Sequence, residues 1–455
     1  MTPSNPHTIL MLLSAPFFLS LLVPQAPAGT PPRYRLIELS VSGALSGQAF
    51  DVNERRAVVG TFDPGDTVPL GAHAALWTTD GTRIDLTPDA NYWFGNATSI
   101  NNAGVVAGNV DTRDAQREGA FRWQDGVLEF LPTRYQSEAR HVDERGRIGG
   151  SAHSAVFQFE PTIWAPDLSY EQFPALGGGD GVVQDINGWG DSVGYDLRTS
   201  TGFDWGAFDL RDGVLRVLDA LPGHASCFAL ATNVQRMTVG WSGPVLGEHA
   251  VRWHPDGTLE ALPRVGTGGS IAASVNDHGE IVGYSTGLQG RIAALWLDGA
   301  GYSLESLVDD LAGRRLLGAE NINERGDIVG YFSPAGGGFA RPFLAVRTDG
   351  GHPAVIGPTP AVAGGTSTFE LVGVTPGAVV ALYLGLRHGS TPIVSCAATS
   401  VEIRNPRVLL GIAGLDGSVR FDVRIPAFVR GQSVLAQAFE FGRCRRTSLS
   451  VTRLD

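Results

Sequence analysis

The chain has 455 residues and a formal net charge of −12, which is too acidic for non-specific binding to nucleic acid or to an anionic membrane surface. Its 60 Gly and 27 Pro lie among short apolar runs, a composition typical of all-β proteins and not of helical ones. This length exceeds one ordinary core and predicts several domains, or a repeat array with an extra module.

The first 28 residues resemble an export signal. An apolar run from Ile9 to Val23 is followed by Ala26-Pro27-Ala28, which places small residues where signal peptidase cleaves. The run is too short to cross the roughly 30 Å of a bilayer core. We therefore predict that residues 1–28 are a cleaved signal peptide of a bacterial protein. The mature chain is expected to be secreted or held at the cell surface, without membrane insertion.

One pattern then occurs seven times. Each copy ends in a glycine, and an Asn or Asp stands seven residues before it. An Asx side chain accepts a backbone hydrogen bond two residues on and starts a turn, and in five copies a glycine three residues later closes the hairpin. Arg56 and Arg236 replace that glycine, so two hairpins should have strained or different turns. The seven Asx residues are Asn53, Asn101, Asp143, Asn187, Asn233, Asn276 and Asn323.

A second hairpin follows in each copy. Its first strand precedes an acidic turn residue, which glycine follows in six copies, and Asp-Gly between apolar runs is a strong hairpin signal. Four short strands per copy correspond to one blade, so residues 29–350 predict a seven-bladed β-propeller. The last copy lacks its fourth strand, and Tyr34–Leu39 should supply it by pairing with the strand around Phe343. The acidic turn residues are Asp80, Asp125, Asp167, Asp212, Asp256, Asp298 and Asp349.

The repeat also resembles a known family. Segments such as ATSINNAGVVAG and AENINERGDIVG, each followed by an apolar strand and Asp-Gly, are similar to the HAF repeat of extracellular bacterial proteins. The resemblance covers about residues 34–350. It implies export and repeat architecture, and it implies no particular biochemical activity.

Residues 353–455 lose the period. Alternating segments between Ser367 and Phe439, separated by Gly and Pro turns, predict an Ig-like β-sandwich. Cys396 and Cys444 fall in this module and could form a disulfide, which would leave Cys227 unpaired. The sequence leaves that pairing open.

Turn chemistry accounts for fourteen polar residues of the repeats, so we assign no catalytic residue, cofactor or metal. The Gly-x-Ser-x-Gly match at Gly190–Gly194 belongs to the repeat and is read as strand. What remains is a set of aromatic residues that do not repeat. We predict that they bind ligand, with packing between blades as the alternative. They are Tyr92, Trp93 and Phe94 between two strands, Trp189 in a hairpin turn and Trp205 in a long connection.

Three functions fit these features. The leading one is a secreted, monomeric, non-enzymatic binding or scaffold protein with a glycan or partner protein at its propeller loops. An extracellular carbohydrate-active enzyme is the second, and it requires two carboxylates that turns do not use, converging near the central channel. The third is a structural spacer protein at the cell surface.

Overall fold

The computed structural model describes residues 30–454, apart from 66–70, 89–91, 113–117, 155–157, 175–178, 199–203, 245–246, 394–395 and 397–398. The predicted signal peptide lies outside this range. Pro32–Asp455 form one compact unit. In the described part of the chain, no helix has the length and apolarity to cross a membrane.

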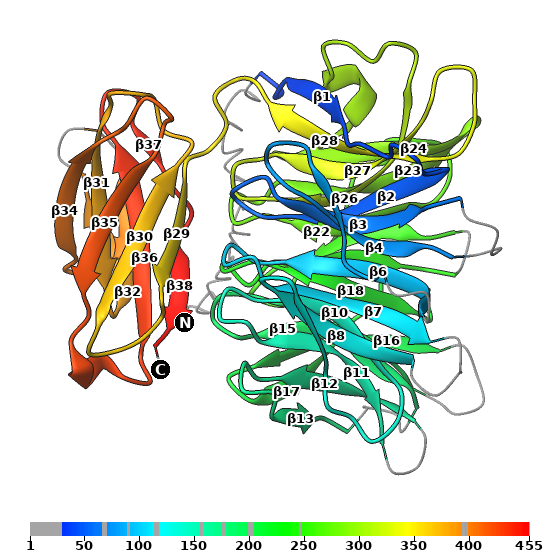
Figure 1. Ribbon diagram of the computed structural model, residues 1–455, viewed down its shortest axis with the longest axis horizontal. Helices are drawn as coiled ribbons and strands as arrows, with labels where there is room; N and C mark the ends of the chain where they lie inside the picture. Colours follow the sequence, from blue (N-terminus) through cyan, green and yellow to red (C-terminus); the bar gives the residue numbers. More distant parts are fainter. Residues whose placement is uncertain are drawn as a thin grey trace, which may run out of the picture. The chain divides into compact units, whose positions relative to one another are not determined.

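The described residues before 350 form seven four-stranded antiparallel sheets (Figure 1). Six of them are built from four consecutive strands. These are β2 (Ser46–Val52), β3 (Val58–Asp63), β4 (His73–Trp77) and β5 (Arg83–Asp85); β6 (Tyr92–Ile100), β7 (Val106–Thr112), β8 (Glu118–Gln124) and β9 (Val127–Phe130); β10 (Ser137–Val142), β11 (Ile148–His153), β12 (Phe159–Trp164) and β13 (Tyr170–Gln172); β14 (Gly181–Ile186), β15 (Ser192–Leu197), β16 (Trp205–Arg211) and β17 (Val214–Leu218); β18 (Cys227–Thr232), β19 (Thr238–Ser242), β20 (His249–Trp253) and β21 (Leu259–Ala261); and β22 (Ser270–Val275), β23 (Ile281–Gly287), β24 (Gly290–Leu297) and β25 (Ala300–Ser303).

The remaining sheet joins the two ends of the repeat region. It contains β26 (Arg315–Ile322), β27 (Ile328–Ser333) and β28 (Arg341–Arg347), preceded by the short 3-10 helix η1 (Leu304–Leu307). Its fourth strand is β1 (Tyr34–Glu38), which pairs antiparallel with β28 and sets Glu38 opposite Phe343. The predicted N-terminal strand is thereby confirmed, and the edge of β28 is paired.

The sheets close into a ring. The first strand of each sheet contacts the first strand of the next, and β26 contacts β2. The innermost strands therefore surround a common axis, which is the arrangement of a β-propeller.

A close backbone approach explains why each repeat ends in glycine. In every sheet the first strand carries a register shift beside the residue that faces this glycine, for example between Ala229 and Ala231 opposite Gly240. A Cβ on Gly240 would overlap the carbonyl oxygen of Phe228, and the glycines of the other six copies meet the equivalent carbonyl.

The predicted Asx turns are present in all seven sheets, and the second hairpin forms in six of them. Asn53 Oδ1 accepts hydrogen bonds from the backbone N–H groups of Arg55 and Ala57, both at 3.0 Å. Arg56 and Arg236 adopt φ of 64° and 61°, the left-handed region that favours glycine. The sequence predicted strained or different turns at these two hairpins, and the structure shows the turn kept with a non-glycine residue in the left-handed region. Each guanidinium is held by an aspartate of the preceding sheet, and the pairs are Arg56–Asp327 at 2.7 Å and Arg236–Asp191 at 2.8 Å.

The C-terminal module packs one antiparallel sheet against another. Phe369, Leu371 and Phe421 of the first sheet share a buried core with Val380 and Leu382 of the second. The first sheet contains β29 (Ala354–Thr359), β30 (Thr366–Val372) and β35 (Val419–Arg424). The second contains β31 (Val379–Gly385), β34 (Arg407–Ile412), β36 (Ser433–Glu440), β37 (Arg445–Arg446) and β38 (Ser450–Arg453), with β32 (His388–Pro392), β33 (Ser400–Ile403) and the 3-10 helix η2 (Ala427–Val429) outside both.

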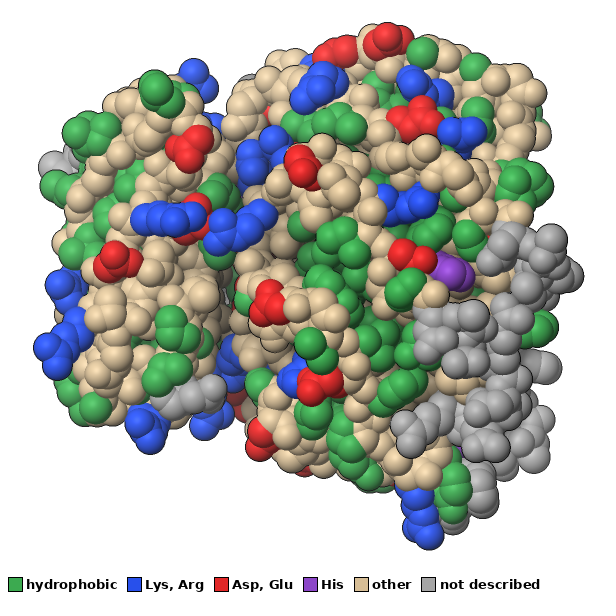
Figure 2. Space-filling view, in the orientation of Figure 1, with side chains coloured by type: hydrophobic (Ala, Val, Ile, Leu, Met, Phe, Trp, Pro, Cys, Tyr) green, Lys and Arg blue, Asp and Glu red, His purple; other side chains and the backbone are tan. Residues whose placement is uncertain are grey.

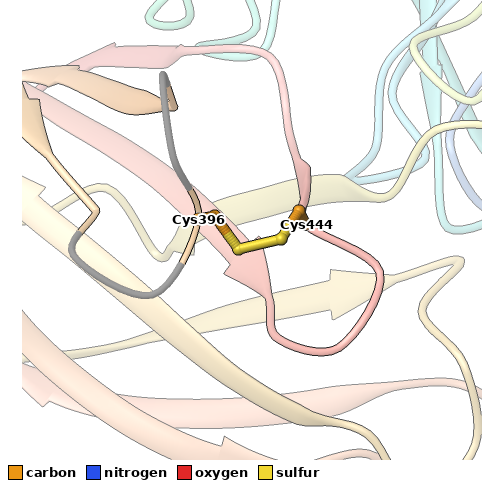
Figure 3. Close-up of a disulfide and its surroundings, with 2 residues drawn as sticks. All are labelled: Cys396 and Cys444. Carbon is orange, nitrogen blue, oxygen red and sulfur yellow. A yellow bond between two sulfur atoms is a disulfide. The ribbon is translucent and has the colours of Figure 1, made fainter.

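The cysteine pairing is resolved by this module. Cys396 and Cys444 form a disulfide between two connections of the module (Figure 3), and their Cα atoms are 5.9 Å apart. Cys227 is a free, buried thiol in the propeller.

Candidate functional site

Side-chain amides link the seven turns that surround the axis. Besides starting its own turn, each turn asparagine donates from Nδ2 to the backbone carbonyl of the corresponding residue in the next sheet. The last link, from Asn323 to Asn53, spans 3.1 Å and closes the circle. Asp143 has no such donor, and its carboxylate instead accepts hydrogen bonds from Arg145 and Arg147. The other donors are Asn53, Asn101, Asn187, Asn233 and Asn276.

The residue after each turn Asx forms a second circle, which we call the mouth ring. Five of its side chains accept a hydrogen bond from the backbone N–H of the mouth-ring residue in the preceding sheet. Glu54 accepts from Glu324 at 2.8 Å, and Glu324 accepts from Asp277 at 3.0 Å. Gly188 and Val234 have no acceptor to offer, so the circle is interrupted there. The mouth ring consists of Glu54, Asn102, Glu144, Gly188, Val234, Asp277 and Glu324.

The C-terminal module contacts the mouth ring at this interruption. A Cβ on Gly188 would lie 3.0 Å from the carbonyl oxygen of Val451 in β38, so the two backbones are close. Trp189 beside it packs against the buried cluster of the module that includes Val451, and its Nε1 donates to the carbonyl of Val234 at 2.9 Å. The small residue and the indole together fit the module against the turns.

A cavity of about 370 Å³ lies at the mouth ring. Besides the ring itself, its wall contains inner-strand residues of the sheets and residues 448–451 of the C-terminal module. Among the described residues, Arg140 and His141 are the basic side chains of the lining. By contrast, acidic and arginine side chains are interspersed over the face seen in Figure 2. Eight carboxylates line the cavity, namely Asp51, Glu54, Asp143, Glu144, Asp185, Asp277, Glu320 and Glu324.

Burial shifts the protonation of these carboxyl groups. It raises the pKa of Glu54 to about 8 and the pKa of Asp277 and of Glu320 to about 7. It also raises the pKa of Glu324, and the nearby carboxylates of Asp277 and Glu54 add to that effect. Near neutral pH the cavity therefore contains carboxyl groups that change charge readily when a cation or a proton approaches.

Glu54 has one oxygen without a partner. The residue is 7% exposed, and its Oε2 atom has no hydrogen-bond partner, while Oε1 accepts from Glu324. An unpaired buried carboxylate oxygen costs free energy, which a ligand that donates a hydrogen bond would recover. We take this atom as a candidate binding group of the cavity.

Three of the predicted binding aromatics lie in a strand and not in a connection, which corrects the sequence interpretation. Tyr92, Trp93 and Phe94 begin β6, the first strand of its sheet. Tyr92 packs against the core shared by the first two repeats, whereas Trp93 is 44% exposed. Of the triplet, Trp93 is the one that offers a free ring face.

Trp205 also begins a strand, β16, and does not lie in the preceding connection as expected. Its ring is half-buried in an aromatic group with Tyr195 and Phe228, at centroid distances of 5.6 and 5.5 Å. Phe228 in turn stacks on Trp241 at 4.2 Å. Trp189 is the half-buried contact to the C-terminal module described above. The structure does not bring the predicted aromatics together at one place.

Sequence reasoning did not identify the mouth ring. The acidic residues Glu54, Glu144, Asp277 and Glu324 each stand directly after a turn Asx, at the same place in four copies. That recurrence was visible in the sequence. Its meaning was not evident, because hairpin turns often contain acidic residues that face solvent. Only closure of the ring brings the seven turns to one axis.

Comparisons with known proteins give structural likeness alone. No family model matches the chain, and no curated protein matches it. It is similar in structure to the β-propeller domain of the Trilobed protease from Pyrococcus furiosus, with 10% identity, TM-score 0.47 and coverage of 70% of this chain and 94% of that one. It is also similar to an acylaminoacyl peptidase from Pyrococcus horikoshii, with 11% identity, TM-score 0.44 and coverage of 65% of this chain and 51% of that one. Hydrazine synthase from Kuenenia stuttgartiensis is similar with 10% identity, TM-score 0.35 and coverage of 93% of this chain and 68% of that one.

Proposed function

We propose that this protein is a secreted, non-enzymatic binding or scaffold protein whose ligand occupies the cavity at the mouth ring. In this proposal the repeats are HAF-type blades of a seven-bladed propeller, and residues 353–455 are an Ig-like β-sandwich. The observation that carries the proposal is the set of cavity carboxylates, several of which no turn requires. Four of them come from equivalent positions in four different sheets.

The mouth-ring geometry supports binding more than catalysis. The carboxyl groups of Glu54, Asp277 and Glu324 each accept a backbone N–H of a neighbouring sheet, Glu324 with both oxygens, so their positions are fixed by the ring. Side chains fixed in this way form a preorganised site, which lowers the cost of binding.

The test is a binding screen with matched variants. Neutral oligosaccharides, peptides and amines are assayed by thermal shift against wild type, Glu54→Gln and Glu171→Gln, where Glu171 is an exposed residue of β13. The proposal expects a ligand whose stabilisation is lost in Glu54→Gln and kept in Glu171→Gln. A ligand whose stabilisation is lost only in Trp93→Ala would place the site at the exposed Trp93 of β6 and contradict the cavity proposal.

A carbohydrate-active enzyme is the second candidate, and one observation favours it. Such an enzyme needs two carboxylates near the channel that do not form turns. Asp51 and Glu54 both line the cavity and neither starts a turn. A carboxyl with a raised pKa, such as Glu54, is the usual general acid of a glycosidase. Release of reducing ends from a polysaccharide by wild type, abolished in Glu54→Gln, would establish this function instead.

A further inference from the structure

The charge of the mouth-ring cavity defines the class of ligand, and this inference rests on the proposed function. Of the eight carboxylates, Asp143 is neutralised by Arg145 and Arg147. Glu54, Asp277 and Glu324 have no salt bridge among the described residues. They are joined to one another through backbone N–H groups and not through cations. These three carboxyl groups therefore have no cation of the described protein beside them to balance their charge once they ionise.

Apolar side chains stand among the polar groups of the wall between these carboxylates. Val52, Val142, Ile186, Val234 and Val275 contribute to the same lining, each from the end of an inner strand or from the turn that follows it. A ligand that complements this surface needs several positive charges separated by methylene segments. A single ammonium ion would pair with one carboxylate and make no use of the apolar side chains of the wall.

We propose that the cavity binds a linear aliphatic polyammonium ligand, with an ammonium group donating to the unpartnered Oε2 of Glu54 and others facing Glu324 and Asp277. The cavity volume of about 370 Å³ is in the range of small-molecule sites. Charge-assisted hydrogen bonds from ammonium to carboxylate are among the stronger polar contacts in proteins.

Binding of such a ligand is coupled to protons. The ammonium groups stay charged at neutral pH, and their approach favours the ionised form of each carboxyl, so protons leave the protein as the ligand enters. The groups that act on Glu54 belong to the β10–β11 turn and the β26–β27 turn, and those that act on Asp277 belong to β14 and to the C-terminal module. These groups are Glu144, Glu324, Arg325 and Asp327 for Glu54, and Asp185 and Glu402 for Asp277.

Isothermal titration calorimetry with spermidine tests the inference, using wild type in two buffers of different ionisation enthalpy. We expect saturable one-site binding, proton release that shows as a buffer-dependent heat, and affinity that rises about tenfold or more from pH 6 to pH 8. Glu54→Gln should weaken binding by about tenfold or more, and Glu171→Gln should leave it unchanged. Asp277→Asn, which keeps the acceptor for Val234, provides a second variant if Glu54→Gln unfolds.

The outcomes separate this inference from the proposed function. Spermidine binding that is equal in wild type and Glu54→Gln, or binding without proton release, would overturn the polyammonium assignment. So would saturable binding of calcium without spermidine. A neutral oligosaccharide whose binding is lost in Glu54→Gln would overturn the assignment and keep the cavity as the site. If no probe depends on Glu54 or Asp277, both proposals fail.

Discussion

Replacing Asn323 by aspartate tests the amide circle at the place where it closes. Asn323 Oδ1 accepts from the N–H groups of Arg325 and Asp327, and the substitution keeps both acceptor contacts. It removes the Nδ2 donor that faces the Asn53 carbonyl at 3.1 Å and sets a carboxylate oxygen against that carbonyl, in a residue that is 5% exposed. Loss of one hydrogen bond and burial of an unsatisfied acceptor predict a loss of about 2–4 kcal/mol in unfolding free energy.

The assay is equilibrium urea unfolding followed by tryptophan fluorescence, with Asn405→Asp, an exposed asparagine outside the propeller, as the matched control. The control should change stability by less than about 0.5 kcal/mol. When the pH is lowered, the introduced carboxyl of Asn323→Asp gains a proton that can donate to the Asn53 carbonyl, so its destabilisation should shrink. A loss below about 0.5 kcal/mol at neutral pH, or one that does not change with pH, would refute the role assigned to the Nδ2 donor.

Three further predictions concern backbone approach, the disulfide and pH. Gly240→Ala should lower the free energy of unfolding by about 3 kcal/mol or more, because its Cβ would overlap the Phe228 carbonyl. Gly365→Ala is the control, because a Cβ at Gly365 meets open space. Denaturant midpoints of the two variants make the comparison. Cys396→Ser should destabilise the C-terminal module by about 4 kcal/mol, because it opens a loop between cysteines 48 residues apart. An unchanged thermal transition in differential scanning calorimetry would contradict this stabilising role of the disulfide. Because the pKa of Glu54 is raised to about 8, its protonated form favours the fold, and that contribution is lost as the pH rises from about 4.5 through 8. Glu54→Gln should therefore gain stability relative to wild type by more than about 1 kcal/mol between pH 5 and pH 9, and parallel pH profiles would argue against the raised pKa.

Local chemistry made much of the fold predictable. The turn at Asn53, the left-handed Arg56 and the pairing of β1 with β28 all follow from short-range rules, because an Asx turn, a missing glycine and an unpaired edge each have a local signature. The one natural aspartate of the circle, Asp143, was also visible as an exception, and its arginine partners lie two and four residues away.

The site could not be predicted in the same way. Glu54 lies hundreds of residues before Glu324 in the sequence, and Asp277 lies tens of residues before it. Their contacts form only because the sheets close into a ring. A sequence pattern cannot show that an acidic residue beside a turn faces an axis and not solvent. For the same reason the sequence pointed to aromatic residues as ligand-binding groups. Trp189 and Trp205 depart from the repeat because each packs against other side chains of the protein.

The central claim is that the mouth ring keeps buried carboxyl groups available for a ligand. Carbon-13 NMR titration of the glutamate and aspartate carboxyl groups, in wild type and Glu54→Gln, tests it most directly. We predict at least one signal that titrates near pH 8 in wild type, as expected for the pKa of Glu54, and is absent from Glu54→Gln. Titration of every carboxyl signal at ordinary values near pH 4 would contradict the account.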